Sequence, residues 1–539
     1  MCLVRAKDLG PVSKRVWMSI VRRCIRACSP PDPRLVRLVL RSVPLTLLLA
    51  APLAAPLTPA TAQDLLWVRQ TGSAGLDQAM SVAIDSAGNA YTGGYTDGTL
   101  GGNVGGNPGG PNAGGYDIAL IKYSASGTPL WTRQIGSAAD DLAYGVAVDS
   151  ASNVYITGNT RGNLGGPNAG GSDIFLAKYN PAGTLLWMRQ AGSAGFEFTY
   201  GVSTDGVGNA YITGYTTGSL GGPNAGAGDI FLAKYDASGT LLWMRQTGSA
   251  SGDVASGVSV DSAGNAYIAG ETYGNLGGPN AGNRDIILAK YDAAGTLLWT
   301  RQLGTAGADV AESVAADNTG NVYITGFTYG NLAGPNAGLD DIFLAKYSAS
   351  GTLLWIRQTG TVGEDGAQSV AVDDSGNAYI SGYTTGNLGR QGLGSYDVFL
   401  AKYDASGNQV WIRQTGTAEF EYATGVAVAA GGNAYITGAT YGNLGGPNAG
   451  SADSFVARYG VLPCSTLADI AGGGPGGQAG DGIIDGSDFI AFINSFAAGD
   501  VNIDPRADVA GGGLAGLDPD GIIDGSDFIA FINAFAAGC

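Results

Sequence analysis

The sequence has 539 residues, of which 91 are glycine, and its formal net charge is −17. Only 14% of the residues are charged and 45% are hydrophobic, which excludes a charged disordered polymer and a helical coiled coil and favours short strands between turns. Histidine is absent, which excludes a Ser-His-Asp or Cys-His nucleophile, a His-ligated zinc and a His general base.

Residues 1–62 are predicted to be a signal peptide with a long basic leader. A Lys/Arg-rich stretch leads into the apolar run VPLTLLLAAPLAAPL, and ATA then precedes Gln63, which places a small-x-small cleavage site after Ala62. A membrane anchor is the alternative, and it is disfavoured because the run is short and contains Pro44, Pro52 and Pro56. We therefore expect an exported protein, secreted or at the cell surface, without a membrane span after cleavage.

Cleavage would leave 18 Lys/Arg and 43 Asp/Glu, a formal charge of −25. Nucleic acid and anionic membranes are unfavourable partners for such a surface, so we expect neither. Cys464 and Cys539 would be the two remaining cysteines, and exported chains favour disulfides, so one disulfide between them is predicted. The alternative is that Cys539 is an attachment point.

Seven repeats are predicted within residues 63–460. Each contains one W-x-R-Q word, with Trp at 67, 131, 187, 243, 299, 355 and 411, so the spacing is 56 residues in every interval except the first, which is 64. The period from Gly201 holds four strand-like runs, GVSTD, NAYITG, DIFLAKY and TLLWMRQ. Tight Gly/Asp turns join the first and the last pair, and a long Gly/Pro-rich loop joins the middle pair. This pattern predicts a mainly β fold, a seven-bladed propeller of four-stranded antiparallel blades.

The two ends of the repeat region are predicted to complete one blade. DLLWVRQ at 64–70 is an outermost-type strand with no blade before it, and DSFVARY at 453–459 is a third strand with no fourth strand after it. The recurring words DIFLAKY and GTLLW, with a VAVDSAGNAYITG-like segment before them, resemble the SBBP repeats of exported bacterial proteins. The resemblance covers about 395 residues and implies a propeller, but it implies little about activity.

Two sets of acidic residues recur in the repeats. One set follows each Trp by ten residues and could either hold a cation as a ring or cap backbone N–H groups of its own loop, and capping is the favoured interpretation. Its members are Asp77, Asp141, Glu197, Asp253, Asp309, Asp365 and Glu421. The other set opens the third strands and is predicted to form cross-strand ion pairs with the W-x-R arginines, for example Asp229 with Arg245. Its members are Asp117, Asp173, Asp229, Asp285, Asp341, Asp397 and Asp453.

Charged residues that do not recur are the candidates for a site that breaks the repeat symmetry. They are Arg161, Arg284, Arg390, Glu271, Glu312, Asp340 and Asp374, and the sequence predicts no contact between any two of them. No Gly-x-Ser-x-Gly word or phosphate-binding Gly-Lys-Ser/Thr loop is present, so no enzymatic activity is expected.

The long loops are predicted to emerge together on one face of the propeller, where a glycan or a peptide could bind. Six tyrosines are predicted to follow the second strands and either stack on such a ligand or pack beneath their own loops. They are Tyr95, Tyr215, Tyr273, Tyr329, Tyr383 and Tyr441.

Residues 461–539 carry two similar units, offset by 39 residues, that are spaced like twelve-residue calcium loops. The predicted calcium ligands are Asp481, Ile483, Asp485 and Asp488 in the first unit, and Asp518, Asp520, Ile522, Asp524 and Asp527 in the second, with the isoleucines contributing backbone carbonyls. Each loop precedes a predicted helix with one apolar face, which begins at Phe489 or Phe528. Glycine-rich turns with solvated aspartates are the alternative.

This ending, closed by Gly538 and Cys539, resembles the GC-type dockerins of exported planctomycete proteins. The resemblance implies a small α module with two calcium loop-helix units that docks to a cohesin-like or cell-surface protein. The sequence departs from the pattern at position 1 of each loop, where Asp469 and Asp508 are the expected ligands once extra glycine-rich residues are looped out. The first unit also lacks a side-chain ligand at position 3, so its site is expected to be the weaker one.

The sequence therefore predicts an exported, non-catalytic propeller scaffold or binding protein that assembles through a calcium-dependent module. Two alternatives stay open at this point. One is an extracellular carbohydrate-active enzyme or an accessory protein in polysaccharide degradation, and the other is a cell-surface adhesion protein.

Overall fold

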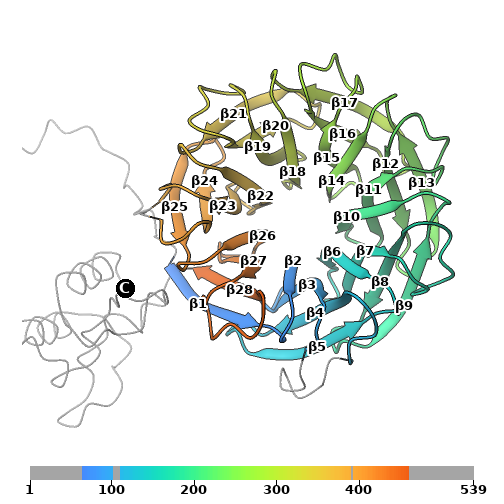
Figure 1. Ribbon diagram of the computed structural model, residues 1–539. Helices are drawn as coiled ribbons and strands as arrows, with labels where there is room; N and C mark the ends of the chain where they lie inside the picture. Colours follow the sequence, from blue (N-terminus) through green and yellow to red (C-terminus); the bar gives the residue numbers. More distant parts are fainter. Residues whose placement is uncertain (1–63, 101–109, 390–391, 461–539) are drawn as a thin grey trace, which may run out of the picture. The chain divides into compact units, whose positions relative to one another are not determined.

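The computed structural model describes residues 64–100, 110–389 and 392–460, which form seven four-stranded antiparallel sheets around a central axis (Figure 1). This confirms the predicted seven-bladed propeller. No helix occurs among the described residues, and none there could span a membrane. The predicted C-terminal module lies outside the described residues.

Each blade runs from an innermost strand at the axis to an outermost strand at the rim. In this order, blade 1 consists of β2 (Asp77–Ile84), β3 (Ala90–Thr96), β4 (Asp117–Tyr123) and β5 (Pro129–Ile135), and blade 2 of β6 (Asp141–Val148), β7 (Val154–Thr160), β8 (Asp173–Tyr179) and β9 (Leu185–Ala191). Blade 3 consists of β10 (Glu197–Thr204), β11 (Ala210–Thr216), β12 (Asp229–Tyr235) and β13 (Leu241–Thr247), and blade 4 of β14 (Asp253–Val260), β15 (Ala266–Thr272), β16 (Asp285–Tyr291) and β17 (Leu297–Leu303). Blade 5 consists of β18 (Asp309–Ala316), β19 (Val322–Thr328), β20 (Asp341–Tyr347) and β21 (Leu353–Thr359), and blade 6 of β22 (Asp365–Val372), β23 (Ala378–Thr384), β24 (Asp397–Tyr403) and β25 (Gln409–Thr415).

Blade 7 is assembled from both ends of the repeat region. Its strands are β26 (Glu421–Val428), β27 (Ala434–Thr440), β28 (Asp453–Gly460) and, as the outermost strand, β1 (Asp64–Thr71). β1 pairs antiparallel with β28, from Asp64 opposite Gly460 to Thr71 opposite Ser454. The predicted closure of the ring is therefore confirmed.

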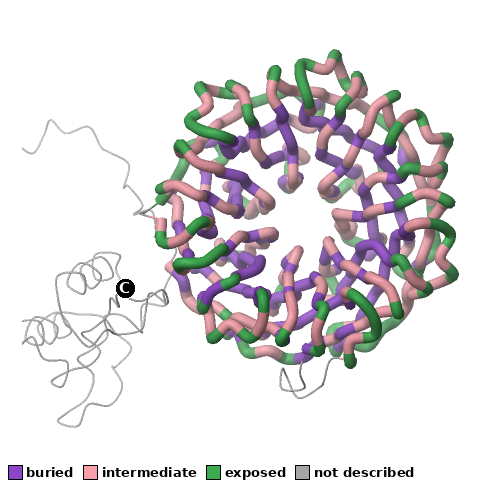
Figure 2. Tube along the Cα trace, viewed as in Figure 1, coloured by how far each residue is buried: buried purple, intermediate pink, exposed green. Residues whose placement is uncertain are grey.

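The second and third strands of every blade form the core. In blade 3, all seven residues of β12 and six of the seven in β11 are buried, because neighbouring blades cover both faces of the sheet (Figure 2). The hairpins close tightly against the preceding blade. Gly239, in the hairpin between β12 and β13, has a φ of +83°, and a Cβ there would lie 2.7 Å from a ring carbon of Trp187.

The strand order places all long loops at one end of the propeller, as predicted. The tight hairpins leave each blade at one end, and the long loops and blade-to-blade connections leave it at the other. Gln246, near the end of β13, accepts a hydrogen bond from Leu220 N at 2.9 Å, which fixes the long loop of blade 3 on the strand end. Gly228 in this loop forms a parallel bridge with Gly252 in the connection to blade 4.

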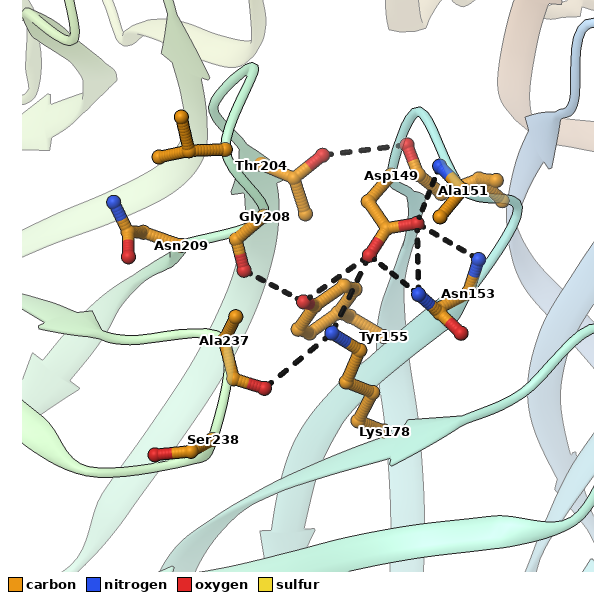
Figure 3. Close-up of polar contacts among 12 residues, drawn as sticks. Asp149, Ala151, Asn153, Tyr155, Lys178, Thr204, Gly208, Asn209, Ala237 and Ser238 are labelled. Atoms are coloured by element: carbon orange, nitrogen blue, oxygen red, sulfur yellow. Dashed lines mark hydrogen bonds and ion pairs between the residues drawn. The ribbon is translucent and has the colours of Figure 1, made fainter.

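Polar contacts at the hairpin end join each blade to the next. In Figure 3, Lys178 Nζ lies 3.3 Å from Asp149 Oδ2 within blade 2 and donates to Ala237 O in blade 3 at 3.4 Å. Tyr155 Oη donates to Gly208 O in blade 3 at 2.6 Å. The same Lys–Asp pair is present in blades 1 to 6.

The predicted ion pair between Asp229 and Arg245 is wrong. Arg245 lies opposite Leu232 on one face of the sheet, whereas Asp229 lies on the other face together with Gln246. Gln246 Nε2 therefore donates to Asp229 Oδ2 at 2.9 Å. Arg245 instead lies over the ring of Trp243 and donates to Gly295 O in the next blade at 3.0 Å.

Candidate binding site in the central channel

The acidic residues ten positions after each Trp are caps of their own loops, as the favoured interpretation predicted. In every blade the carboxylate accepts a hydrogen bond from the backbone N–H of a Ser or Thr four residues earlier. Asp309 shows the full set, since Thr305 N donates to it at 2.5 Å, Thr305 Oγ1 at 2.9 Å, and Thr328 Oγ1 also donates. Among the described residues, no group of three acidic or cysteine side chains could hold a metal ion.

Each innermost strand contains a β-bulge at its fourth residue. The pairing of β10 with β11 skips Tyr200 between Thr199 and Gly201, and the other six blades skip the equivalent position. A bulge re-aims the side chain of its extra residue, here towards the propeller axis. We call these seven residues the bulge ring: Met80, Tyr144, Tyr200, Ser256, Glu312, Gln368 and Thr424.

The bulge ring differs from blade to blade, although its neighbours repeat. The third residue of the innermost strand is Ala in six blades, the fifth is Gly or Ser in all seven, and the sixth is always Val. The fifth residue must be small because the innermost strands converge at the axis, where a Cβ on Gly201 would lie 2.9 Å from Val258 N. The repeated residues thus form the walls of the channel, and the bulge ring supplies the side chains that differ from blade to blade.

All seven residues of the bulge ring line one cavity of about 410 Å³ at the axis. Glu271, from β15, and Arg284, which precedes β16, also line it. This volume lies in the usual range of small-molecule sites.

Three of the non-recurring charged residues meet in this cavity, which the sequence did not predict. Arg284 Nη1 lies 2.8 Å from Glu271 Oε2, so these two charges compensate each other. Glu312 reaches the same cavity from β18, and no hydrogen bond or ion pair to its carboxylate is found within the described residues. Burial, and then the charge of Glu271, raise the pKa of Glu312 to about 7, whereas Arg284 acts in the opposite direction.

Aromatic rings from blades 1 to 3 contact one another in a row, and two of them, Tyr144 and Tyr200, line the cavity. Tyr144 and Tyr200 meet edge to face with ring centroids 5.5 Å apart, and Tyr95 lies 6.4 Å from Tyr144. Tyr215 lies 6.2 Å from Tyr200 and stacks on Phe198 at 5.1 Å. The rings form one continuous wall, which we call the aromatic wall.

A second acidic group lies at the long-loop end of blades 5 and 6. Asp340 and Glu364 occupy bridged positions on adjacent loops, and Tyr396 Oη donates to Glu364. Burial, with a further contribution from the Glu364 charge, raises the pKa of Asp340 to about 6, although backbone hydrogen bonds act against it. Tyr383 Oη in β23 donates to Asp340 Oδ2 at 3.5 Å, and burial, followed by the charge of Asp340, raises the pKa of Tyr383.

The six tyrosines proposed for stacking occupy two different positions. Tyr95, Tyr215 and Tyr383 lie within their second strands, whereas Tyr273, Tyr329 and Tyr441 follow theirs and are exposed. Tyr95 and Tyr215 belong to the aromatic wall. The sequence alone did not separate tyrosines in GYT, which lie within the strand, from tyrosines in TYG, which follow it, because the two motifs are similar.

The other non-recurring charges do not join the channel site. Arg161 forms an ion pair with Asp140 at 2.9 Å, and Asp374 is exposed in the hairpin that follows β22. Arg390 lies outside the described residues. The same is true of Cys464, Cys539 and the predicted calcium ligands Asp469, Asp481, Ile483, Asp485, Asp488, Asp508, Asp518, Asp520, Ile522, Asp524 and Asp527.

The bulge ring was not predicted from the sequence, although the sequence contains a signal for it. When the seven innermost strands are aligned, the second and fourth residues vary while the others repeat. The aspartates of the Lys–Asp pairs were missed as well, although six of the seven blades carry Asp at that position and the seventh has Ala429.

Replacing Glu312 with Gln is expected to stabilise the propeller above pH 7 and to change little near pH 4.5. The pKa of Glu312 in the folded state, about 7, exceeds the ordinary value of 4.5, so the folded state binds more protons between these pH values. The carboxyl therefore lowers stability as pH rises through this window, by an amount that partial exposure limits to about 2 kcal/mol. Urea unfolding midpoints at both pH values measure the effect. Asp374→Asn is the control, and an equal loss of stability at both pH values in Glu312→Gln would contradict the assignment.

Six segments match a protein-family model described as SBBP: Beta-propeller repeat. They are residues 66–102, 130–165, 186–221, 242–277, 298–333 and 354–389, and each begins in an outermost strand and ends after the second strand of the next blade. The predicted SBBP repeats are therefore present in the chain.

Two curated relatives share part of the sequence. The chain is 22% identical over 471 residues to "Uncharacterized WD repeat-containing protein L264" of Acanthamoeba polyphaga mimivirus, which covers 64% of this chain and 34% of the relative. It is 29% identical over 244 residues to "Regulatory protein FlaEY" of Caulobacter vibrioides, which covers 42% and 25%. The chain thus spans between a quarter and a third of the length of these relatives. Among solved structures, the WD40 β-propeller domain of Doa1 has a TM-score of 0.43 at 10% identity, over 75% of this chain and 98% of that chain.

Proposed function

Since SBBP β-propeller repeats build this seven-bladed ring, we propose that the protein is an exported, non-catalytic binding scaffold whose ligand site is the axial cavity. The bulge ring carries the proposal. If the bulge ring had only a structural role, every blade could carry the same residue at the bulge, as the blades nearly do at the neighbouring positions. Instead, the varying residues and three non-recurring charges gather in one cavity of ligand size.

Filling the cavity is expected to abolish ligand capture. Ser256→Trp adds an indole at the axis from the bulge ring, while Ser238→Trp adds the same group to an exposed hairpin residue that does not line the cavity. The full chain is applied to glycan and peptide arrays, followed by the two variants. Ligands retained by Ser238→Trp and lost by Ser256→Trp support the proposal. Ligands unaffected by Ser256→Trp place the binding surface elsewhere and contradict it.

We also propose that residues 461–539 dock the scaffold to a cohesin-like or cell-surface protein through two calcium loops. The support is the pair of acidic loops in the sequence, each followed by an apolar helix pattern. The leader at residues 1–62 supports export, where calcium is available and a Cys464–Cys539 disulfide is stable.

Calcium is expected to bind the full chain at two sites of unequal affinity, as measured by calorimetry. The double variant Asp520→Ala, Asp524→Ala should remove the tighter site, because the second loop has the fuller set of ligands. The matched variant Asp481→Ala, Asp485→Ala should remove only the weaker one. A chain that takes up no calcium, or both variants binding as tightly as the parent, would refute the docking proposal.

Glycan hydrolysis is a second candidate function that one observation favours. A carboxyl with a pKa of about 7 in the same cavity as a second carboxyl, as in Glu312 and Glu271, is the kind of group that acts as a general acid in glycoside hydrolysis. Reproducible cleavage of any glycan by the full chain, lost in Glu312→Gln, would replace the scaffold assignment with this one.

A further inference from the structure

We propose that the axial cavity recognises a protonated amine, which binds between the carboxylate of Glu312 and the rings of Tyr144 and Tyr200. This inference rests on the proposed function, because it names the ligand chemistry of the same cavity.

The lining of the cavity has one uncompensated negative charge. Arg284 and Glu271 form a pair at 2.8 Å, which leaves Glu312 as the remaining charged group of the lining. Asp340 and Glu364 lie outside this lining, at the long-loop end of blades 5 and 6. A partly buried carboxylate without a counter-charge is costly, and a bound cation would supply what the protein side chains do not.

The aromatic wall gives this cation a second point of attraction. Tyr144 and Tyr200 belong to the same bulge ring as Glu312, on β6, β10 and β18 respectively, which all border the axis (Figure 1). Tyr200, Glu312 and Glu271 line the same cavity, and burial raises the pKa of Tyr200, with the two carboxylates acting in the same direction. Aromatic faces attract ammonium groups, and a carboxylate opposite them adds to that attraction.

The lining fits an organic cation better than a metal ion. Hard divalent cations need several oxygen ligands at one point, and no group of three acidic side chains among the described residues supplies them. A cavity of about 410 Å³ accommodates a small amine such as an alkylamine or an amino polyol.

The experiment compares amines with their neutral counterparts on the full chain, by calorimetry above pH 7, where Glu312 is mostly ionised. The probes are n-butylammonium against n-butanol and glucamine against sorbitol. We expect each amine to bind at least about tenfold more tightly than its alcohol. The pair with the larger difference shows whether the ligand carries an alkyl or a polyol chain.

Variants of Glu312 and Tyr200 test whether these two residues cause the difference in affinity between amines and alcohols. Glu312→Gln keeps the shape of the side chain and should reduce amine affinity to that of the alcohol, whereas Asp374→Asn should leave it unchanged. Tyr200→Leu should weaken the amine more than the alcohol, because leucine keeps apolar contact and loses the aromatic face. Circular dichroism confirms that each variant is folded.

Equal affinity for amines and alcohols, no measurable binding of any probe, or an unchanged amine affinity in Glu312→Gln would each overturn the inference. These results are separable from a failure of the proposed function. If array ligands are lost in Ser256→Trp but retained in Glu312→Gln, the cavity binds a ligand that is not recognised through an amine. If Ser256→Trp loses nothing, both proposals fall.

Discussion

Deletion of residues 64–71 is expected to lower the melting temperature by more than about 10 °C and to make the protein associate. β1 is the outermost strand of blade 7, and it forms the ladder with β28 that joins the two ends of the propeller. It also contributes Trp67, whose ring meets Tyr435 edge to face and whose Nε1 donates to Ala125 O in blade 1 at 3.1 Å. The lost burial and hydrogen bonds are on the order of 5 kcal/mol or more. Without β1, β28 becomes an open edge that can pair with another chain.

A circular permutant tests whether closure, and not the mere length of the chain, causes this loss. Asp64 and Gly460 lie directly opposite each other, so a short Gly/Ser linker can join them as a hairpin. New ends are then opened in the exposed part of the 217–228 loop of blade 3. We expect the permutant to melt close to the parent and to stay monomeric by light scattering. A deletion variant as stable as the parent would contradict the role assigned to β1.

Replacement of Asp309 with Ala is expected to reduce the free energy of unfolding by about 3 to 5 kcal/mol. The side chain is fully buried and accepts hydrogen bonds from Thr305 N, Thr305 Oγ1 and Thr328 Oγ1. Alanine leaves these donors without their acceptor, in a place that water does not reach. Hydrogen exchange of the connection between β17 and β18 should accelerate together with the loss of stability.

Asp292→Ala is the matched control, because Asp292 also caps a turn through backbone hydrogen bonds but lies on the exposed hairpin between β16 and β17. Its effect should be small. If the two variants lost the same stability, burial would not be the reason for the recurrence of the acidic residue. Comparison of Asp309→Asn with Asp309→Ala separates charge from hydrogen bonding, since Asn keeps one acceptor oxygen.

Most of the fold was predictable because each blade repeats the same local sequence pattern. The 56-residue period, the tight turns and the alternating strands recur in every repeat, so an error in one copy is corrected by the others. The split seventh blade was also predictable, because β1 and β28 are recognisable as a fourth and a third strand. The acidic caps followed from their recurrence, since a residue needed in every blade is explained by something that every blade does.

The ion pair assigned to Asp229 failed for a physical reason that the sequence does not display. Arg245 and Gln246 are adjacent and therefore point to opposite faces of β13, and only the pairing register shows which of them shares a face with Asp229. The contact that Arg245 makes instead, with Gly295 O, belongs to the next blade. Contacts between blades depend on how the sheets pack against each other, and the sequence of a single repeat does not specify this packing.

The sequence by itself determined the number of blades, the order of their strands and the closure of the ring, because these follow from short-range patterns that repeat seven times. Only the tertiary structure decided where the chemistry lies. Glu271, Arg284 and Glu312 looked unrelated along the chain, and they meet because the bulge of β18 places Glu312 at the axis, where β15 and the residue before β16 bring Glu271 and Arg284 to the same cavity. Convergence at an axis is a property of the closed ring, so the residues of the site become neighbours only when the seven blades have assembled.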